Sequence, residues 1–400
     1  MSSSQTSSSG ILLVDKPKGV TSHDVVSCAR GLLHTKRVGH AGTLDPMATG
    51  LLILGFGNAT RLLNYLLGHD KTYEAVIRLG ESTNTDDADG DVVSSVDDEN
   101  SILNSANTDE ILKELRCVIA KNFTGHIMQT PTAFSAIKIN GVRAYDLARE
   151  GKDVHLEPRE VVIHDFSLLY ARFNVGVSGA KVVDVRASIS CSSGTYIRAL
   201  ARDLGRVLGV GGHLVSLRRT RIGEFSVEDD RVLKLETRIR TFTDKNGVTQ
   251  TRAKAVVADR HDSVSDYFSD SVSNSSVACD LSGDSSCKKS AQKNYDLQNR
   301  VLSMFESAKL TMQTVEISEN QAKDLRFGRK IVIPAISEKN TIAYVKAEKD
   351  EQNDVVAVLE TAEKSPATAG GSRAFSKLQE KNEKNINQIE AKPIVVFVQS

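Results

Sequence analysis

Hydrophobic and polar positions along the chain repeat with two periods, and each period predicts one kind of element. Residues 71–79 alternate with a period of two, which predicts a strand with Tyr73 on its apolar face. Residues 21–33 instead place their apolar side chains at helical spacing. At the start of that segment, Thr21 and Asp24 resemble a capping box with Asp replacing the usual Glu. The chain is therefore expected to contain both helices and strands.

The same patterns predict further elements in the first part of the chain. Apolar runs and alternation predict strands at residues 11–14, 51–54, 133–139, 161–173, 180–190 and 214–217. Helical spacing predicts helices at residues 109–121, 144–150 and 195–208, and one that begins near Asn58 or Thr60 and ends near Leu67.

Changes in composition predict where the ordered parts begin and end. Residues 1–9 are polar and rich in Ser, which is typical of a disordered N-terminus. The periodic elements then fill residues 10–236. Residues 237–295 are rich in Ser, Asp, Lys and Arg and poor in periodic apolar positions, so we expect a disordered insertion there.

Order is expected to return after residue 296, in a small β-rich C-terminal domain. Ser318 and Gln321 form a capping box, and Gly328 stops the helix that follows. Strands are expected at residues 330–333, 341–346, 355–359 and 394–398. A second polar insertion is expected at residues 361–391.

Composition narrows the class of protein. The 400 residues are 40% hydrophobic, but no apolar run approaches the ~20 residues that a membrane helix needs. The N-terminus has neither the basic nor the apolar region of a secretory signal, so we expect a cytoplasmic protein. The five cysteines show no paired or metal-binding spacing, so no metal site is expected.

Charge gives a mixed indication about nucleic acids. The formal net charge is zero, which argues mildly against a polyanionic partner. Residues 198–221 nevertheless contain six arginines and a single acid, Asp203. Arg198, Arg202 and Arg206 recur every four residues, so they form one stripe on a helix. Such stripes are more often plain solvated surface, although a basic face can coexist with acidic loops elsewhere.

The stretch from Gly39 to Gly50 contains the candidate for chemistry. Its one carboxylate, Asp45, precedes Pro46, which biases it toward an extended backbone, and the surrounding glycines allow a close approach to another chain. A lone Leu-Asp-Pro is more often a surface turn. The length of the whole stretch counts against that interpretation.

This stretch and several others closely resemble the TruB-type tRNA pseudouridine synthases, in the family's order. The matching segments span residues 10 to about 235 and are residues 10–17, 39–50, 71–73, 85–91, 135–138, 194–198 and 212–219. The resemblance implies an α+β fold, in which a catalytic domain with a mixed, largely antiparallel sheet precedes a PUA-like C-terminal domain. It implies isomerisation of uridine 55 in the TΨC arm of tRNA to pseudouridine.

The resemblance also assigns roles to particular residues. Asp45 is the catalytic carboxylate and Arg198 its ion-pair partner. Tyr73 stacks on the flipped base and is a possible acceptor of the C5 proton, while Tyr196 and Leu217 line the base pocket. His40 fills the vacancy left in the RNA. Without the family, Tyr73 and Leu217 would more often be core residues and His40 a loop histidine.

The remaining expectations concern RNA binding and partners. Arg202, Arg218 and Arg219 are candidates for contacts with the RNA backbone. We expect no cofactor, tRNA as the partner, and a monomer that acts alone. Two alternatives stay open: a non-catalytic tRNA-binding or folding module, and a synthase that depends on a guide RNA. The sequence does not choose whether Asp45 attacks C1′, adds to C6 or removes a sugar proton.

Overall fold

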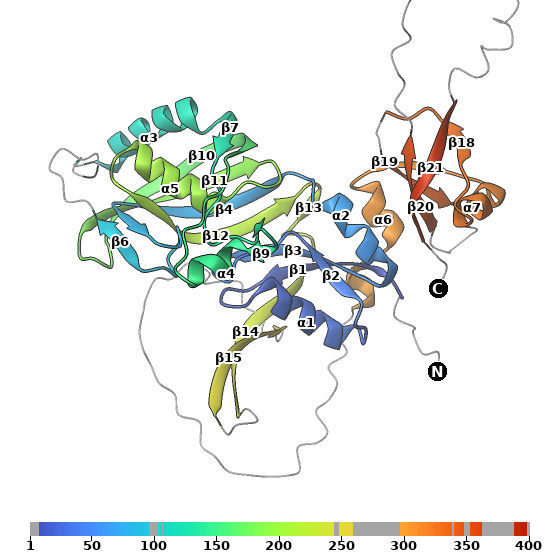
Figure 1. Cartoon of the computed structure of the whole chain (residues 1–400), viewed down its shortest axis with the longest axis horizontal. Helices are drawn as coiled ribbons and strands as arrows, with labels where there is room; N and C mark the ends of the chain where they lie inside the picture. The colour runs from blue at the N-terminus through green and yellow to red at the C-terminus, as the bar shows by residue number, and fades with distance from the viewer. Residues whose placement is uncertain are drawn as a thin grey trace, which may run out of the picture.

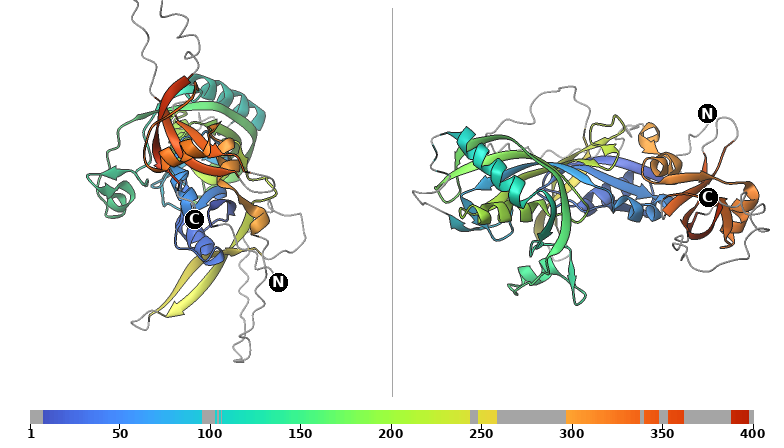
Figure 2. Two further views of the ribbon diagram at one scale, coloured as in Figure 1. Left: turned by 90° about the vertical axis from the view of Figure 1, so that its right-hand side faces the viewer. Right: turned by 90° about the horizontal axis from the view of Figure 1, so that it is seen from above.

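The computed structural model places two sheets side by side, a large one and a smaller C-terminal one (Figure 1). It describes residues 8–95, 103, 105, 107–243, 248–258, 297–337, 340–347, 353–361 and 388–397. Within these residues the large sheet has 12 strands and the C-terminal sheet has five. The right-hand view in Figure 2 shows the smaller sheet at one end of the elongated molecule.

The large sheet is mixed and mainly antiparallel, as predicted. Its parallel pairs are β1 with β14 and β3 with β12. The strands, in spatial order, are β15 (Thr249–Val257), β14 (Leu233–Thr243), β1 (Gly10–Lys16), β3 (Thr49–Phe56), β12 (Gly212–Ile222), β4 (Lys71–Leu79), β11 (Lys181–Cys191), β10 (Arg159–Val175) and β7 (Gly125–Gln129). Three short strands pair beside this path: β2 (Val38–Ala41), β13 (Phe225–Ser226) and β16 (Val301–Leu302).

The pair β3–β12 joins two packed halves of the sheet. One hydrophobic core contains residues of β4, β10, β11 and the helices α3 (Thr108–Asn122) and α5 (Ile197–Val207). Two further cores contain residues of β1 and β3 with the helices α1 (Ser22–Leu32) and α2 (Leu63–Leu66). The loop that leads into β3 therefore lies where the two halves of the sheet meet.

Most predicted helices and strands are confirmed. Strand β4 alternates buried and half-buried residues along its whole length, and α1 begins with the predicted capping box of Thr21 and Asp24. The helix expected near residue 60 is split into the 3-10 turn η1 (Gly57–Arg61) and α2. The helix α4 (Ala144–Arg149) also lies where expected. No helix in the described part of the chain combines the length and hydropathy needed to span a bilayer.

The strand predicted at residues 133–139 is wrong. Only Lys138–Ile139 (β8) is strand, and it pairs with Val142–Arg143 (β9) in a small hairpin. The carbonyl of Phe134 accepts a hydrogen bond from Arg198, and that of Ser135 accepts one from the Tyr145 amide. These backbone groups are bound by a side chain and a local turn, so they do not pair with a neighbouring strand.

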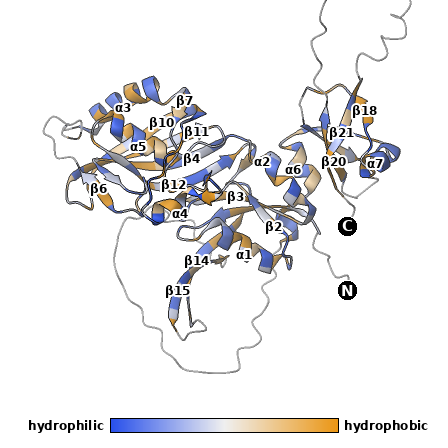
Figure 3. Cartoon of the chain, viewed as in Figure 1, coloured by the Kyte–Doolittle hydropathy of each residue, from blue (hydrophilic) through white to orange (hydrophobic). Residues whose placement is uncertain are grey.

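The disordered insertion predicted at residues 237–295 is wrong in its first part. Strands β14 and β15 pair from Leu235 opposite Val257 to Thr243 opposite Thr249, and they form a hairpin that projects from the sheet (Figure 1). Figure 3 shows that this hairpin is mainly hydrophilic. The described residues of its outer part, 238–243 and 248–252, are exposed, so the sequence there carries no burial pattern. Residues 259–296 lie outside the described residues.

The C-terminal part agrees with a small β-rich domain. Its strand order is β17 (Gln313–Glu316), β19 (Asn340–Val345), β20 (Asp354–Thr361), β21 (Gln388–Val396) and β18 (Ile331–Pro334). The helices are α6 (Met304–Lys309) and α7 (Glu319–Arg326), and α7 begins with the predicted Ser318 capping box. The predicted polar insertion at 361–391 overlaps both β20 and β21; residues 362–387 lie outside the described residues.

Two further short strands, β5 (Glu81–Thr83) and β6 (Val92–Ser95), pair near the large sheet.

Candidate active site

The Asp45 loop connects β2 to β3, at the pair that joins the two halves of the large sheet. Gly50 ends the loop with a φ of +102°, and a Cβ atom there would lie 2.2 Å from the carbonyl oxygen of Arg219. Only glycine fits such a close approach at a positive φ. The Asp45 carbonyl accepts a hydrogen bond of 3.1 Å from the Ala48 amide, which turns the chain back toward β3.

Three buried side chains hold this loop by its backbone. The Ser22 hydroxyl donates to the Leu44 carbonyl at 3.1 Å and accepts from the Leu44 amide at 2.9 Å. The Lys16 ammonium donates to the carbonyls of Ala48 at 2.6 Å and Pro46 at 3.3 Å. The Arg219 guanidinium donates to the carbonyls of Gly42 at 3.0 Å and Leu51 at 2.9 Å. These bonds restrain the backbone of the loop, and thereby the position from which the Asp45 side chain extends.

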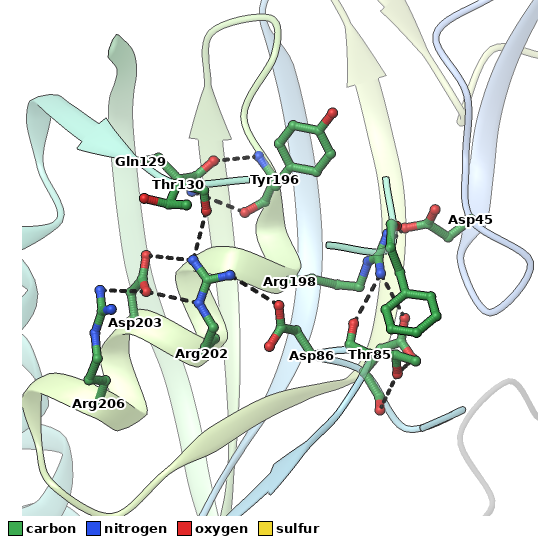
Figure 4. Close-up of polar contacts among 12 residues, drawn as sticks. Asp45, Thr85, Asp86, Gln129, Thr130, Tyr196, Arg198, Arg202, Asp203 and Arg206 are labelled. Carbon is green, nitrogen blue, oxygen red and sulfur yellow. Dashed lines mark hydrogen bonds and ion pairs between the residues drawn. The ribbon is translucent and has the colours of Figure 1, made fainter. Parts of the chain in front are cut away.

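Arg198 supplies the ion-pair partner of Asp45. Its Nε lies 3.0 Å from Asp45 Oδ2, and the two side chains point toward each other in Figure 4. The remaining guanidinium nitrogens donate to the carbonyls of Thr85 at 3.0 Å and Phe134 at 2.9 Å, and Nη1 lies 3.4 Å from Asp87 Oδ2. The Arg198 side chain is only 6% exposed. A planar fork with partners on each side has one available orientation.

Opposing effects set the ionisation of Asp45. Burial raises the pKa of the Asp45 carboxyl above its ordinary value, and the Asp87 carboxylate adds to this, whereas Arg198 and Lys16 oppose the rise. Burial also lowers the pKa of Lys16 to about 8, although Asp45 works in the other direction. The Asp45 side chain is still 38% exposed, because one side of it faces a cavity.

The cavity beside Asp45 has a volume of about 280 Å³. This is near the lower end of the ~300–1,000 Å³ typical of small-molecule sites, which suits one base with its sugar. Tyr73, Tyr196, Leu217 and Arg198 line it together with Asp45. Burial raises the pKa of the phenols of both Tyr73 and Tyr196, so both are neutral at pH 7. The cavity thus combines aromatic and apolar walls with one carboxylate.

His40 lies outside this lining, as far as the chain is described. It is on β2, two residues before Gly42, which does line the cavity. Its Nδ1 has no hydrogen-bond partner among the described residues. Burial, then the nearby Arg219 and His23, lower the pKa of His40, so its ring is neutral at pH 7.

The arginines predicted to contact RNA are engaged within the protein. Arg219 is only 2% exposed, holds the Asp45 loop and lines the cavity beside Asp45. A contact between Arg219 and the RNA backbone stays a prediction. Arg218 forms two hydrogen bonds of 2.9 and 2.8 Å with Asp15. Arg202 binds Asp86 at 3.1 Å and Asp203 at 3.0 Å (Figure 4). For Arg218 and Arg202 a phosphate contact stays a prediction.

Sequence reasoning gave no role to Lys16, Ser22 or Asp87. One signal was available for Lys16, a charged residue two positions beyond the apolar run of residues 11–14. Such a lysine is rarely buried without a specific partner. Ser22 lies just after the helix cap, where hydroxyl residues are common, so its sequence position carried no separate signal. Asp87 was one of four acids in a polar segment.

Comparison with known proteins gives the family. Residues 30–197 match the TruB family pseudouridylate synthase (N terminal domain), and residues 198–252 match the tRNA pseudouridylate synthase B C-terminal domain. The chain belongs to the TruB family of pseudouridine synthases. A tRNA pseudouridine synthase B of Bifidobacterium longum (strain DJO10A) is 44% identical, over 89% of this chain and 96% of that protein. One of Arthrobacter sp. (strain FB24) is 53% identical, over 56% of this chain and 70% of that protein.

Two solved structures share the fold of this TruB-family chain. One, of an H/ACA RNP bound to a substrate RNA containing 2′-deoxyuridine, has a TM-score of 0.53 and 20% identity, over 98% of this chain and 85% of that chain. The other, of a Cbf5-Nop10-Gar1 complex, has a TM-score of 0.52 and 21% identity, over 98% and 84%. The predicted α+β architecture is confirmed by this likeness.

Proposed function

We propose that this protein is a tRNA pseudouridine synthase that isomerises uridine 55, in the TΨC arm of tRNA, to pseudouridine. The observation that carries the proposal is the ion pair between Asp45 and Arg198 beside a nucleoside-sized cavity. Family membership supplies the reaction, since relatives that match nearly the whole chain are named tRNA pseudouridine synthase B. A module that only binds tRNA has no need of a carboxylate held in this way.

The reaction breaks the N1–C1′ bond, turns the uracil and joins C5 to C1′, with no redox change and no external acceptor. Asp45 starts it by one of three routes: attack on C1′, addition to C6, or removal of a sugar proton. Each route requires the ionised carboxylate. Arg198 and Lys16 favour that form against burial, which supports the assignment of Asp45 as the reacting group.

The target uridine has to leave the RNA stack before Asp45 can reach it. Tyr73 and Tyr196 offer aromatic faces for the flipped base, worth ~1–3 kcal/mol of stacking per base. Leu217 excludes water from that side. A buried neutral phenol is a weak base, so the position of Tyr73 favours stacking over acceptance of the C5 proton. His40, a neutral ring next to the loop, is our candidate for filling the vacancy in the RNA.

The test is to incubate the purified chain alone with an unmodified tRNA transcript and to map pseudouridine by carbodiimide modification and primer extension. We expect one modified position, at uridine 55, with the Asp45→Asn protein as the inactive control. Modification only after addition of a guide RNA or other proteins would identify a guide-dependent synthase. Binding without modification under all of these conditions would leave the non-catalytic alternative. We also propose a monomer, which light scattering of the purified chain checks.

A further inference from the structure

The hairpin of β14 and β15, here called the basic arm (Leu233–Thr243 and Thr249–Val257), differs in charge from the rest of the protein. The whole chain has a formal charge of zero. The basic arm has five basic residues and one acid, Glu236, which gives it a formal charge of +4. The basic residues are Lys234, Arg238, Arg240, Arg252 and Lys254. Such a local surplus is the electrostatic mark of a polyanion-binding surface.

The register of the arm puts like charges opposite each other. Arg238 pairs with Lys254 and Arg240 pairs with Arg252, so all four side chains lie on one face. Like charges directly opposite destabilise a sheet. Glu236 binds Arg238 at 2.6 Å and Asp24 binds Arg252 at 2.8 Å, which offsets one charge in each pair.

Among the residues that the structure describes, no acid pairs with the other charge in each pair. Arg240 and Lys254 are exposed, and neither forms an ion pair with any residue in the described ranges. The same face carries the exposed aromatic ring of Phe242. At the base of the arm the opposite face is buried, with Leu235 and Ala255 in a hydrophobic core, so there solvent reaches only the basic face.

Contacts connect the base of the arm to the catalytic loop. The Thr237 hydroxyl donates to the Lys18 carbonyl at 2.6 Å, and the adjacent Gly19 amide donates to the Pro46 carbonyl at 2.8 Å. Pro46 directly follows Asp45. From Thr237 to its last paired residue, Thr243, the arm extends for six residues, or ~20 Å at the usual strand rise. Figure 2 shows it projecting away from the body of the protein.

We propose that the basic arm binds the phosphodiester backbone of the tRNA while the target uridine occupies the Asp45 cavity. The inference rests on the proposed function, because that function supplies the polyanion. Arg240 and Lys254 contact phosphates, and Phe242 lies against the sugar or base beside them. The arm thereby provides an exposed positive surface, whereas Arg219 is buried beside the Asp45 loop.

The experiment compares tRNA affinity across a range of salt concentrations for the full chain and three double variants. Arg240→Gln/Lys254→Gln removes two charges from the arm, and Arg240→Lys/Lys254→Arg exchanges them. Lys113→Ala/Lys121→Ala removes two exposed charges from α3, which packs near the opposite edge of the sheet, and is the matched control. Thermal unfolding checks that each variant folds.

For the charge-removing variant we expect dissociation constants at 0.1 M salt to rise between roughly eightfold, for one lost phosphate contact, and about sixtyfold, for two. The slope of log affinity against log salt should fall by about 0.9 per contact. The exchanged variant and the α3 variant should match wild type in both affinity and slope. Affinity and slope equal to wild type for Arg240→Gln/Lys254→Gln would overturn the proposal. An arm that binds a protein or an anionic membrane would give that same result.

A different result would contradict the proposed function: the wild-type protein would bind tRNA but make no pseudouridine. Loss of affinity to the same extent in the α3 control would show a general charge effect and would also overturn the proposal.

Discussion

The Nζ atom of Lys16 lies 2.6 Å from the carbonyl oxygen of Ala48, which ties the end of β1 to the far side of the Asp45 loop. Lys16 is fully buried, and this burial lowers the pKa of its ammonium group to about 8. We infer that it positions the loop and does not touch the substrate.

Replacement of Lys16 by Met keeps the length of the side chain and removes its bonds to the loop. We expect kcat to fall by about tenfold to a hundredfold, because small displacements of a catalytic group cost this much, while the affinity for tRNA changes little. Loss of its positive charge should also raise the pKa of Asp45, so the acid limb of kcat should move to higher pH. An unchanged pH profile with lowered tRNA affinity would show a binding role.

Asp45→Asn should reduce single-turnover isomerisation by more than about a thousandfold, since an amide keeps the size of the group but supplies neither nucleophile nor base. The affinity for tRNA should be largely retained. Quench-flow of radiolabelled tRNA gives the rate, and filter binding gives the affinity. Activity within tenfold of wild type would remove Asp45 from the chemistry.

Arg198→Lys should be far from conservative. A lysine ammonium cannot contact Asp45, Asp87 and the carbonyls of Thr85 and Phe134 in the planar arrangement that the guanidinium provides. We expect a loss of about a hundredfold in kcat. Arg206→Lys is the control, since Arg206 lies on the same helix with a largely exposed side chain. Equal rates for both variants would argue against the ion pair as part of the mechanism.

Much of the fold was predictable because burial leaves a period in the sequence. Strand β4 and helix α1 each bury one face against a core, and their apolar residues repeat accordingly. The loop around Phe134 and the basic arm were misread for the complementary reason. The loop gives its carbonyls to Arg198, and the outer arm buries neither face, so neither leaves such a period.

The candidate site was predictable only in part. The family motifs contain Asp45, Tyr73, Tyr196, Arg198 and Leu217, and the structure brings all five to one cavity. The same reasoning named Arg219 as a candidate for RNA contact and did not foresee that it holds the Asp45 loop. Its position opposite Gly50 on neighbouring parallel strands depends on the pairing of β3 with β12, which no local pattern specifies.

The raised pKa of Asp45 predicts how the rate depends on pH. Because the reaction needs the ionised carboxylate, kcat should fall on the acid side with a midpoint above the ordinary value of an aspartate. Asp87 contributes to the rise, so Asp87→Asn should move the midpoint to lower pH. The same raised pKa affects the free energy of unfolding. Because the folded state favours the protonated form of Asp45, the contribution of this group to stability is largest below its unfolded-state pKa. It declines as the pH rises from the unfolded-state pKa through the folded-state pKa. A midpoint moved to higher pH in Asp87→Asn would contradict the electrostatic account.

Gly50→Ala tests whether the β3–β12 pair itself holds the site. The new Cβ would lie 2.2 Å from the Arg219 carbonyl oxygen and 2.7 Å from its amide nitrogen, both backbone atoms that cannot turn aside. Gly209→Ala is the matched control, because Gly209 also has a positive φ, +71°, but its Cβ would meet nothing within 4 Å. The control should lose only the ~1–2 kcal/mol of an alanine at positive φ. Gly50→Ala should lose distinctly more free energy of unfolding than the control, measured by urea denaturation. Its folded fraction should also isomerise uridine much more slowly, because separation of β3 from β12 moves Arg219 and the loop that Arg219 holds. Equal stability and activity in the two variants would show that β3 and β12 can separate without consequence for Asp45.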